Sequence, residues 1–380
     1  MVTDTGSARM RKALVTHDCR GGRDHSEIGH VSLARALAAT LDLDYAGAVE
    51  ECTGRTSLYH FPRRTLCGHD EAARHAVRCE DDLFGGWVAE PFMATKAIVH
   101  PLVSRGAVAP PSWLPAFARE VEEVVLDGLT VFDASDAAQA ARRLLARGAL
   151  RLKPVLAEGA RGQVVVRSKD ELDEALAAVL AHNDVRHGLV LEENLSDVGT
   201  ASVGEVRAAG LKAAYFGIQS LTDDNAGEKV YGGSALYLVR GGMEALLDRP
   251  LDERARRCVV AARVFDRAAD ANFAGFFASR RNYDIAFGTA ADGGERLAVL
   301  EQSWRVGGAT GAEIAALALF RSDPRITAVR ARTVERYGDA DVPDGAVVHY
   351  RGDDPELGRL VKYTVVDDVI RADDRGRHNR

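Results

Sequence analysis

The sequence lacks the features that mark membrane-spanning, secreted and zinc-ribbon proteins. It has no apolar run of about 18 residues, the length that a membrane-spanning helix needs. Residues 1–12 are polar and contain no apolar core, so we expect no secretory signal. The five cysteines show no CxxC spacing and support neither a zinc ribbon nor a disulfide framework: Cys19, Cys52, Cys67, Cys79 and Cys258. These absences predict a cytoplasmic protein with reduced thiols.

Two common nucleotide-binding signatures are also absent, the Gly-Lys-Ser/Thr P-loop and the Rossmann glycine fingerprint. Lysine is scarce, with seven in 380 residues, so a lysine inside a strand is less expected to be an ordinary surface residue without a specific role. The net charge of −7 argues against a general nucleic-acid binder. The length and the 46% apolar content fit a large soluble enzyme of two or three subdomains.

The stretch from Glu301 to Gly308 concentrates the groups that bind metal ions and phosphates. It follows an apolar run, residues 297–300, that predicts a buried strand. Alternation along a strand places Glu301, Ser303 and Arg305 on one face. A carboxylate and a hydroxyl are hard oxygen ligands that suit Mg²⁺, and a guanidinium suits phosphate oxygens. The alternative is an ordinary strand end with a surface ion pair.

A second acid strengthens the metal hypothesis. Asp284 lies in another short strand-like run, residues 282–287, and the polar segment 288–295 can form the turn between the two strands. Asp284 and Glu301 can therefore face each other on neighbouring antiparallel strands. Two facing carboxylates repel each other unless a cation lies between them.

Further upstream, residues 151–156 and 164–166 read as two strands joined by a loop that contains Gly159 and Gly162. Backbone N–H groups in such a loop can bind phosphate oxygens. Lys153 lies inside the first strand, where its charge needs a partner such as a phosphate.

These features, in this order, resemble the ATP-grasp superfamily over roughly residues 90–320. The strand lysine, the glycine loop, a hinge acid and the closing metal motif have counterparts here in Lys153, Gly159 and Gly162, Glu192, Asp284, and Glu301-x-Ser303-x-Arg305. Three phrases resemble more narrowly an uncharacterised ATP-grasp group, DUF3182: residues 94–97, 230–233 and 278–284. The sequence departs from the family at Ser303, where the superfamily has a metal-binding Asn, and residues 196–201 contain no clear ribose-binding acid.

The resemblance implies ATP as the nucleotide and Mg²⁺ as the metal, with Mn²⁺ as the alternative ion. The implied metal ligands are Asp284, Glu301 and Ser303. The implied phosphate-binding and catalytic cations are Lys153 and Arg305. The remaining nucleotide contacts are Lys96, Gly159, Gly162, Glu192, Glu193 and Leu195, the last three at the end of an apolar strand, residues 188–195, that can present backbone groups to adenine.

The expected fold is α+β, with two ATP-grasp subdomains around the nucleotide and a small α/β domain before them. We expect the α/β domain over residues 1–92, with about ten disordered residues at its start. The first subdomain would span 93–184 and the second, with the metal site, 185–335. Short strands and a disordered charged tail from Arg371 would form a C-terminal extension over 336–380.

Local patterns give further expectations. We expect a helix over residues 94–104 that carries Lys96, amphipathic helices over 134–146, 169–181 and 252–270, a hairpin over 203–218, and a lid or clamp loop over 222–233. A strand at 13–16 and a helix at 31–41 should flank a loop rich in histidine and acid. That loop suits contact with substrate better than a metal site, because its spacing matches no ligand template: His17, Asp18, Asp24, His25 and His30.

The leading functional hypothesis is ATP-dependent ligation, in which a carboxylate becomes an acyl phosphate and an amine or other nucleophile displaces phosphate. A kinase-like phosphotransferase on the same fold and a nucleotide-binding regulatory protein remain as alternatives. The expected partners are small-molecule substrates and a second copy of the chain in a homodimer, without nucleic acid or membrane.

Overall fold

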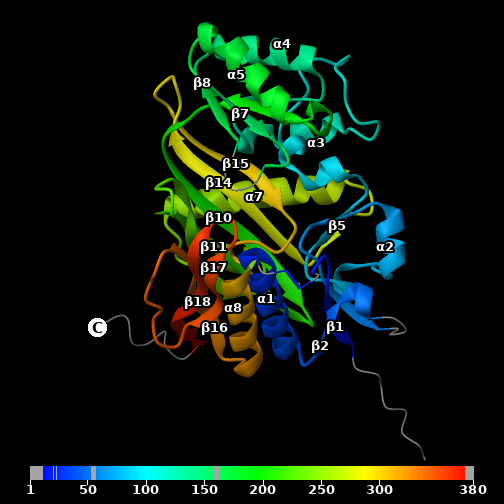
Figure 1. The fold of residues 1–380 in the computed structure, drawn as a ribbon, viewed down its shortest axis with the longest axis vertical. Coiled ribbons are helices and arrows are strands. Elements are labelled where there is room, and N and C mark those ends of the chain that lie inside the picture. The colour runs from blue at the N-terminus through cyan, green and yellow to red at the C-terminus, as the bar shows by residue number, and fades with distance from the viewer. Residues whose placement is uncertain (1–11, 20, 23, 53–56, 158–161, 373–380) are drawn as a thin grey trace, which may run out of the picture.

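The chain folds into three groups of strands and helices, and its class is α+β, as expected (Figure 1). The computed structural model describes residues 12–19, 21–22, 24–52, 57–157 and 162–372. The disorder expected at residues 1–10 and in most of the C-terminal tail concerns residues outside this part of the chain.

A small α/β unit comes first. Its parallel sheet has the order β2–β1–β3, made of Asp44–Ala48, Ala13–Thr16 and Leu58–Phe61. Helix α1 (His25–Leu41) begins earlier than the expected residue 31. The reason is an N-cap, because the Asp24 carboxylate accepts a hydrogen bond from the backbone N–H of Glu27.

A second small sheet joins this unit to the rest of the chain. Strands β4 (Leu66–Cys67) and β5 (Gly86–Val88) flank helix α2 (His69–His75), and β5 pairs with the distant β13 (Phe277–Ala278). The remaining short helical turns are η1 (Val49–Glu51), η2 (Glu80–Asp82), η3 (Pro91–Ala94), η4 (Lys96–Val99), α3 (Pro115–Glu120), η5 (Glu122–Val124) and η6 (Val185–His187).

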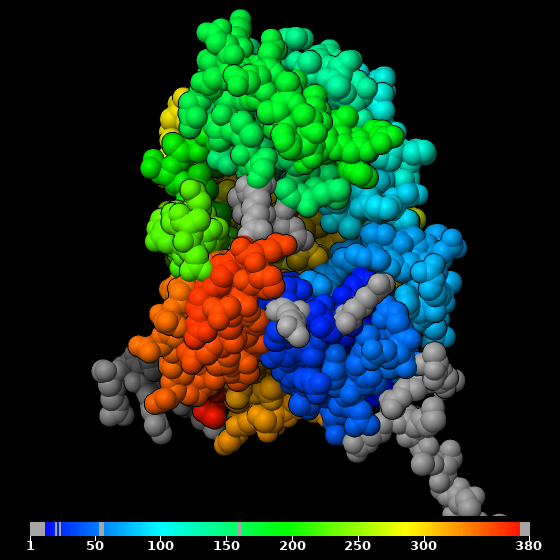
Figure 2. Space-filling model, in the orientation of Figure 1, coloured from blue at the N-terminus to red at the C-terminus, as the bar shows by residue number. Residues whose placement is uncertain are grey.

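The second group is an antiparallel four-stranded sheet with two helices. Its order is β6–β9–β7–β8, made of Gly128–Val131, Leu189–Glu193, Leu150–Pro154 and Val164–Val166. Helices α4 (Ala134–Leu145) and α5 (Lys169–His182) pack their apolar residues against this sheet. Asp133 and Ser168 cap these helices, as the sequence indicates. Figure 2 shows this group, in green, above the blue N-terminal unit and the orange-to-red end of the chain.

The third group is an eight-stranded antiparallel sheet of order β15–β14–β10–β11–β12–β16–β18–β17. Its strands are β10 (Ser196–Ala208), β11 (Leu211–Asp223), β12 (Lys229–Arg240), β14 (Arg280–Thr289), β15 (Glu295–Ser303), β16 (Ile326–Tyr337), β17 (Val347–Asp354) and β18 (Gly358–Arg371). Helices α6 (Met243–Leu247) and α7 (Glu253–Asn272) cover one face, and α8 (Thr310–Ser322) packs with α1 on the other.

Three local expectations were wrong. Residues 94–104 do not form an α-helix, because Pro101 forces the preceding His100 into an extended conformation (φ −119°, ψ 157°) and the chain forms the short turns η3 and η4 instead. The expected lid is mostly strand, since β11 and β12 stay paired as far as Asp223 and Lys229. The chain after residue 335 does not thin to short strands either, because β17 and β18 complete the edge of the large sheet.

Candidate functional site

Strands β14 and β15 bring the two predicted metal-binding acids together. Asp284 lies directly opposite Glu301, and Asn282 lies opposite Ser303, so all four side chains share one face of the sheet. The register shifts between Asp284 and Ile285, which accommodates Leu300 as an extra residue. The pairing predicted from the sequence is therefore confirmed, and Asn282, opposite Ser303, adds an amide oxygen to the same face.

Among the residues that the structure describes, only neutral groups donate hydrogen bonds to Asp284. Its Oδ1 accepts hydrogen bonds from Ser202 Oγ at 3.2 Å, Gln219 Nε2 at 2.8 Å and Asn282 Nδ2 at 3.1 Å. Burial and the facing Glu301 raise the pKa of Asp284, and the hydrogen bonds offset this only in part. The donors fix the orientation of the carboxylate without neutralising it. This is the environment in which a bound cation gains most.

Glu301 meets a buried lysine instead. Lys96 is 4% exposed, and its Nζ lies 3.0 Å from Glu301 Oε2 and 2.8 Å from the carbonyl oxygen of Ala157. The next residue of β15, Gln302, donates from Nε2 to the carbonyl oxygens of Met93 and Thr95, both at 2.9 Å. Gln302 thus fixes the turn that carries Lys96 against β15. Lys96 in turn links the four-stranded unit to the large sheet.

Lys153 lies in β7, as predicted, and its partner among the described residues is a carboxylate. Its Nζ donates to Glu192 Oε1 at 2.9 Å, and Glu192 Oε2 lies 3.1 Å from His100 Nε2. All three side chains are buried. Burial alone would raise the pKa of Glu192, but the Lys153 ammonium and the His100 contact outweigh burial and lower the pKa to about 2. The strand lysine and the hinge acid therefore form one ion pair in this structure.

The other predicted hinge residues lie at the contact between the two sheets. Glu193 Oε1 accepts from the backbone N–H of Asp127 and lies 3.5 Å from Arg296 Nε on the large sheet. Leu195 packs against Ala286 and Ala298, further along the same face of β14 and β15 that carries Asp284. In the glycine loop, Gly162 has a φ of +65°, whereas Gly159 lies outside the described residues.

Ser303 and Arg305 contact a buried ionic network that the sequence analysis did not predict. Arg280 is 1% exposed; its Nη1 donates to Ser303 Oγ at 3.3 Å and to the carbonyl oxygen of Arg305. Its other nitrogens bind the fully buried Glu313 on α8 at 2.9–3.1 Å. Arg305 is half-buried, and its Nη1 donates to the carbonyl oxygen of Val306.

A tyrosine extends this network to the acids. Tyr215 Oη lies 2.6 Å from Glu313 Oε1 and 2.9 Å from Asn282 Oδ1, either of which can accept its one proton, and Asn282 Nδ2 donates to Asp284. The side chain of Tyr215 can lie over β10 and reach Asn282 on β14 because the β10 residue between them is Gly204. A Cβ added at Gly204 would lie 2.3 Å from the tyrosine oxygen. A glycine opposite a tyrosine was the signal available in the sequence, but it identifies no site without the strand register.

A family model described as "Protein of unknown function (DUF3182)" matches residues 14–364. The chain belongs to the DUF3182 family. The match runs from β1 into β18, so it covers the whole of the site described above.

Several solved structures resemble this DUF3182 chain at low sequence identity. D-alanyl-alanine synthetase A from Vibrio cholerae is 9% identical, with a TM-score of 0.46 over 82% of this chain and 98% of that chain. A biotin carboxylase complex from Campylobacter jejuni is 10% identical, with a TM-score of 0.49 over 94% and 87%. The biotin carboxylase domain dimer of a 2-oxoglutarate carboxylase from Hydrogenobacter thermophilus, solved with MgADP, ADP and bicarbonate, is 12% identical, with a TM-score of 0.47 over 94% and 86%.

These scores are too low to say what the DUF3182 chain binds or catalyses. No curated protein matches its sequence significantly. Within the described part of the chain, no helix has the length and apolar character to cross a membrane.

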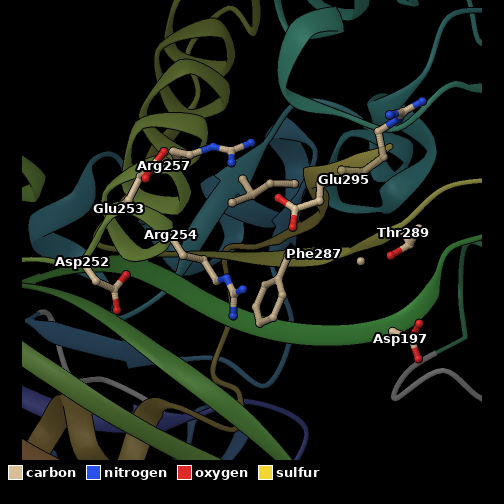
Figure 3. Close-up of a pocket in the computed structure, with 11 residues that line it drawn as sticks. Asp197, Asp252, Glu253, Arg254, Arg257, Phe287, Thr289 and Glu295 are labelled. Carbon is tan, nitrogen blue, oxygen red and sulfur yellow. The ribbon is translucent and has the colours of Figure 1, made fainter. Parts of the chain in front are cut away.

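A separate hollow of 620 Å³ lies at the far end of the β14–β15 hairpin (Figure 3). Arg254 lies over the ring of Phe287 there, 4.5 Å from its centroid, and both acidic and basic side chains line the walls. Phe287 is three residues from Asp284 and so points to the opposite face of β14, which α7 covers. This hollow is thus not part of the site around Asp284.

Proposed function

We propose that this chain is an ATP- and Mg²⁺-dependent ligase that activates a carboxylate as an acyl phosphate. The observation that carries the proposal is the pair Asp284 and Glu301, which face each other across two strands while only neutral groups donate to Asp284. Such a pair is electrostatically unfavourable by itself, and a divalent cation would compensate it.

The donor set fits Mg²⁺. Two carboxylates, the Ser303 hydroxyl and the Asn282 amide oxygen are hard ligands, and Mg²⁺ commonly binds one or two protein carboxylates together with substrate phosphates and water. A hydroxyl at position 303 is a weaker ligand than the amide of the superfamily. Asn282, directly opposite on β14, supplies an amide in the same place on the sheet.

Three cations would bind the phosphates. Lys96 and Lys153 are each buried against a single carboxylate, Glu301 and Glu192, and an ammonium has three N–H groups to share. With Glu301 engaged as a metal ligand, Lys96 would be available to bind a phosphate oxygen in its place. Arg305 follows the end of β15 and offers a planar fork for the transferred phosphoryl group.

The nucleotide would lie along the shared face of β14 and β15. Leu195, Ala286 and Ala298 make an apolar end near the hinge, which suits adenine, and Asp284 and Glu301 mark the phosphate end. Gly159 and Gly162 belong to the loop that follows Lys153, and Glu192 and Glu193 belong to the hinge strand. We assign these residues to nucleotide binding.

In the proposed reaction, a substrate carboxylate oxygen attacks the γ-phosphorus, the bond to the β–γ bridging oxygen breaks, and ADP leaves. An amine then attacks the acyl carbon, loses a proton, and phosphate leaves. The role of Lys96, Lys153 and Arg305 is to hold the phosphate oxygens in line and to offset their negative charge. Mg²⁺ would supply further neutralisation of the same oxygens.

The test is release of ADP from Mg·ATP in the presence of pooled carboxylic acids and pooled amines. A ligase forms ADP only when both pools are present. ADP formation with one pool and a stable phosphorylated product would instead indicate a kinase-like phosphotransferase. ATP binding without turnover in any mixture would indicate a nucleotide-binding regulatory protein.

A further inference from the structure

Three histidines converge at one edge of the N-terminal parallel sheet. His17 follows β1 directly, His60 lies in β3, and His75 is the last residue of α2. Strands β1 and β3 run in parallel register, with Val15 opposite His60, so their carboxyl ends lie side by side. The carboxyl ends of parallel strands are the usual place for ligands in open α/β sheets.

The three rings are close enough to share one ion. His17 Nε2 lies 2.8 Å from His60 Nδ1, and one ring nitrogen from each of the three histidines lies within 4.8 Å of the others. The centroids of His17 and His75 are 4.5 Å apart. Tetrahedral Zn²⁺ with bonds of about 2.0–2.1 Å places its ligand nitrogens about 3.4 Å apart. Shifts on the order of an ångström would therefore bring the three nitrogens to ligand positions.

The surroundings of the three rings favour the neutral imidazole, which is the form that binds metal ions. Burial, with the neighbouring rings of His60 and His75, lowers the pKa of His17 to about 3. Burial, with the His75 ring, lowers the pKa of His60 to about 4.

The surrounding charges leave room for a cation. The guanidinium of Arg64 is held by Glu71 through Nη1 at 3.1 Å, and Glu71 lies on α2 with His75. His17 and His60 are buried, whereas His75 is half-buried and can open a path to solvent. The other histidines of the same loop and helix are engaged elsewhere: His25 binds Asp354, and His30 binds the carbonyl of Phe61.

We propose that His17, His60 and His75 bind one divalent transition-metal ion, Zn²⁺ in the first place. Imidazole nitrogens suit Zn²⁺, whereas the carboxylate oxygens of Asp284 and Glu301 suit Mg²⁺, so the two sites select different metals. Three protein ligands leave a fourth position for water or a small ligand with an oxygen or nitrogen donor. The sequence analysis interpreted the loop after β1 as a substrate contact rather than a metal site. The proposal instead makes its first histidine, His17, a metal ligand together with residues of β3 and α2.

The test is Zn²⁺ binding to chelator-stripped protein by equilibrium dialysis with millimolar Mg²⁺ present. We expect one Zn²⁺ per chain, a rise in the thermal midpoint on Zn²⁺ addition, and intense visible absorption with Co²⁺ as the probe. His75→Ala should weaken Zn²⁺ binding at least tenfold, since it removes a ligand. His69→Ala, an exposed histidine on the same helix, and Asp284→Asn should leave Zn²⁺ binding unchanged.

Equal Zn²⁺ binding by wild type and His75→Ala, or equal losses in His75→Ala and His69→Ala, would show that the histidines are only a hydrogen-bonded cluster. If His75→Ala does not fold, the wild-type protein still decides the matter. Less than one Zn²⁺ per chain together with weak, octahedral-type Co²⁺ absorption would overturn the proposal.

Discussion

At the residue scale, the charges of this site are incompletely balanced without a ligand. Asp284 faces Glu301 and receives only neutral donors, and its pKa is raised by burial and by Glu301. A carboxyl whose folded-state pKa lies above the unfolded value costs stability at high pH. The cost is absent below the unfolded pKa, grows as the pH rises through the folded value, and is complete above it.

Asp284→Asn should therefore stabilise the ligand-free protein and weaken Mg·ATP. The amide keeps the Oδ1 acceptor for Ser202, Gln219 and Asn282 and removes the repulsion with Glu301. We expect the thermal midpoint at pH 7.5 to rise by about 2 °C, the shift that roughly 1 kcal/mol gives in a large domain. Affinity for Mg·ATP, measured by calorimetry, should fall at least tenfold.

Asp223→Asn is the matched control, because Asp223 is exposed at the far end of β11 and pairs with Lys229. It should change neither quantity. A lower midpoint with unchanged nucleotide affinity in Asp284→Asn would assign Asp284 a structural role.

The buried pair of Lys153 and Glu192 allows stability to be separated from binding. Lys153→Met leaves Glu192 buried against His100 alone, and loss of one partner of a buried pair typically costs about 3–5 kcal/mol. Lys153→Met with Glu192→Gln removes both charges and should recover most of the stability, measured by urea unfolding. Both variants should lose about 1.5–3 kcal/mol of ATP affinity, the range for a charge-assisted hydrogen bond, and much less AMP affinity.

Recovered ATP binding in the double variant would show that Lys153 serves only to neutralise Glu192. Equal losses of ATP and AMP affinity would place Lys153 away from the distal phosphates.

At the element scale, the sequence predicts the pairing of strands that are neighbours in the chain but not the contacts between elements that are distant in it. The Asp284–Glu301 pairing was predictable because β14 and β15 are joined by a short turn that sets their register. The Lys96–Glu301 contact was not, since it depends on how Gln302 binds the turn at Met93–Thr95. The wrong helix at 94–104 had a visible signal in Pro101, whose effect on His100 outweighed the apolar spacing.

The contact between Tyr215 on β11 and Gly204 on β10 gives a test of how these two strands support the site. An alanine Cβ at Gly204 would lie 2.3 Å from Tyr215 Oη and 2.5 Å from the carbonyl oxygen of Arg281. Gly204→Ala should displace Tyr215 from Asn282 and Glu313, lower stability by about 1–3 kcal/mol and weaken Mg·ATP binding. The measurements are urea unfolding and calorimetry.

Gly29→Ala is the control for the added methyl group. Gly29 lies inside α1 with no atom near the new Cβ, so this change should be neutral or stabilise by up to about 1 kcal/mol. If Gly204→Ala behaves like Gly29→Ala, the network from Tyr215 to Asp284 adapts freely and does not position the acid.

At the scale of the whole molecule, the N-terminal unit and the large sheet are joined at several points. Strand β5 pairs with β13, Ser279 Oγ donates to the carbonyl oxygen of Leu83 at 2.5 Å, and α1 and α8 share one apolar core. His25 also binds Asp354 at the edge strand β17. The sequence suggests a domain boundary near residue 92. The parts of the chain before and after it differ in architecture, but they pack against each other across a buried interface.

The chain should unfold as one unit despite its four sheets. Calorimetry of the full chain should show a single main transition, and Mg·ATP should raise its midpoint as a whole, since ligand binding stabilises everything that unfolds together. A chain that begins at residue 93 should be unstable, because it lacks α1 and β5 and would expose the apolar side of α8 and the buried Trp304, against which Gly86 packs. Two separate transitions, of which only one responds to Mg·ATP, would instead show that the N-terminal unit is an independent domain that docks weakly on the nucleotide-binding part.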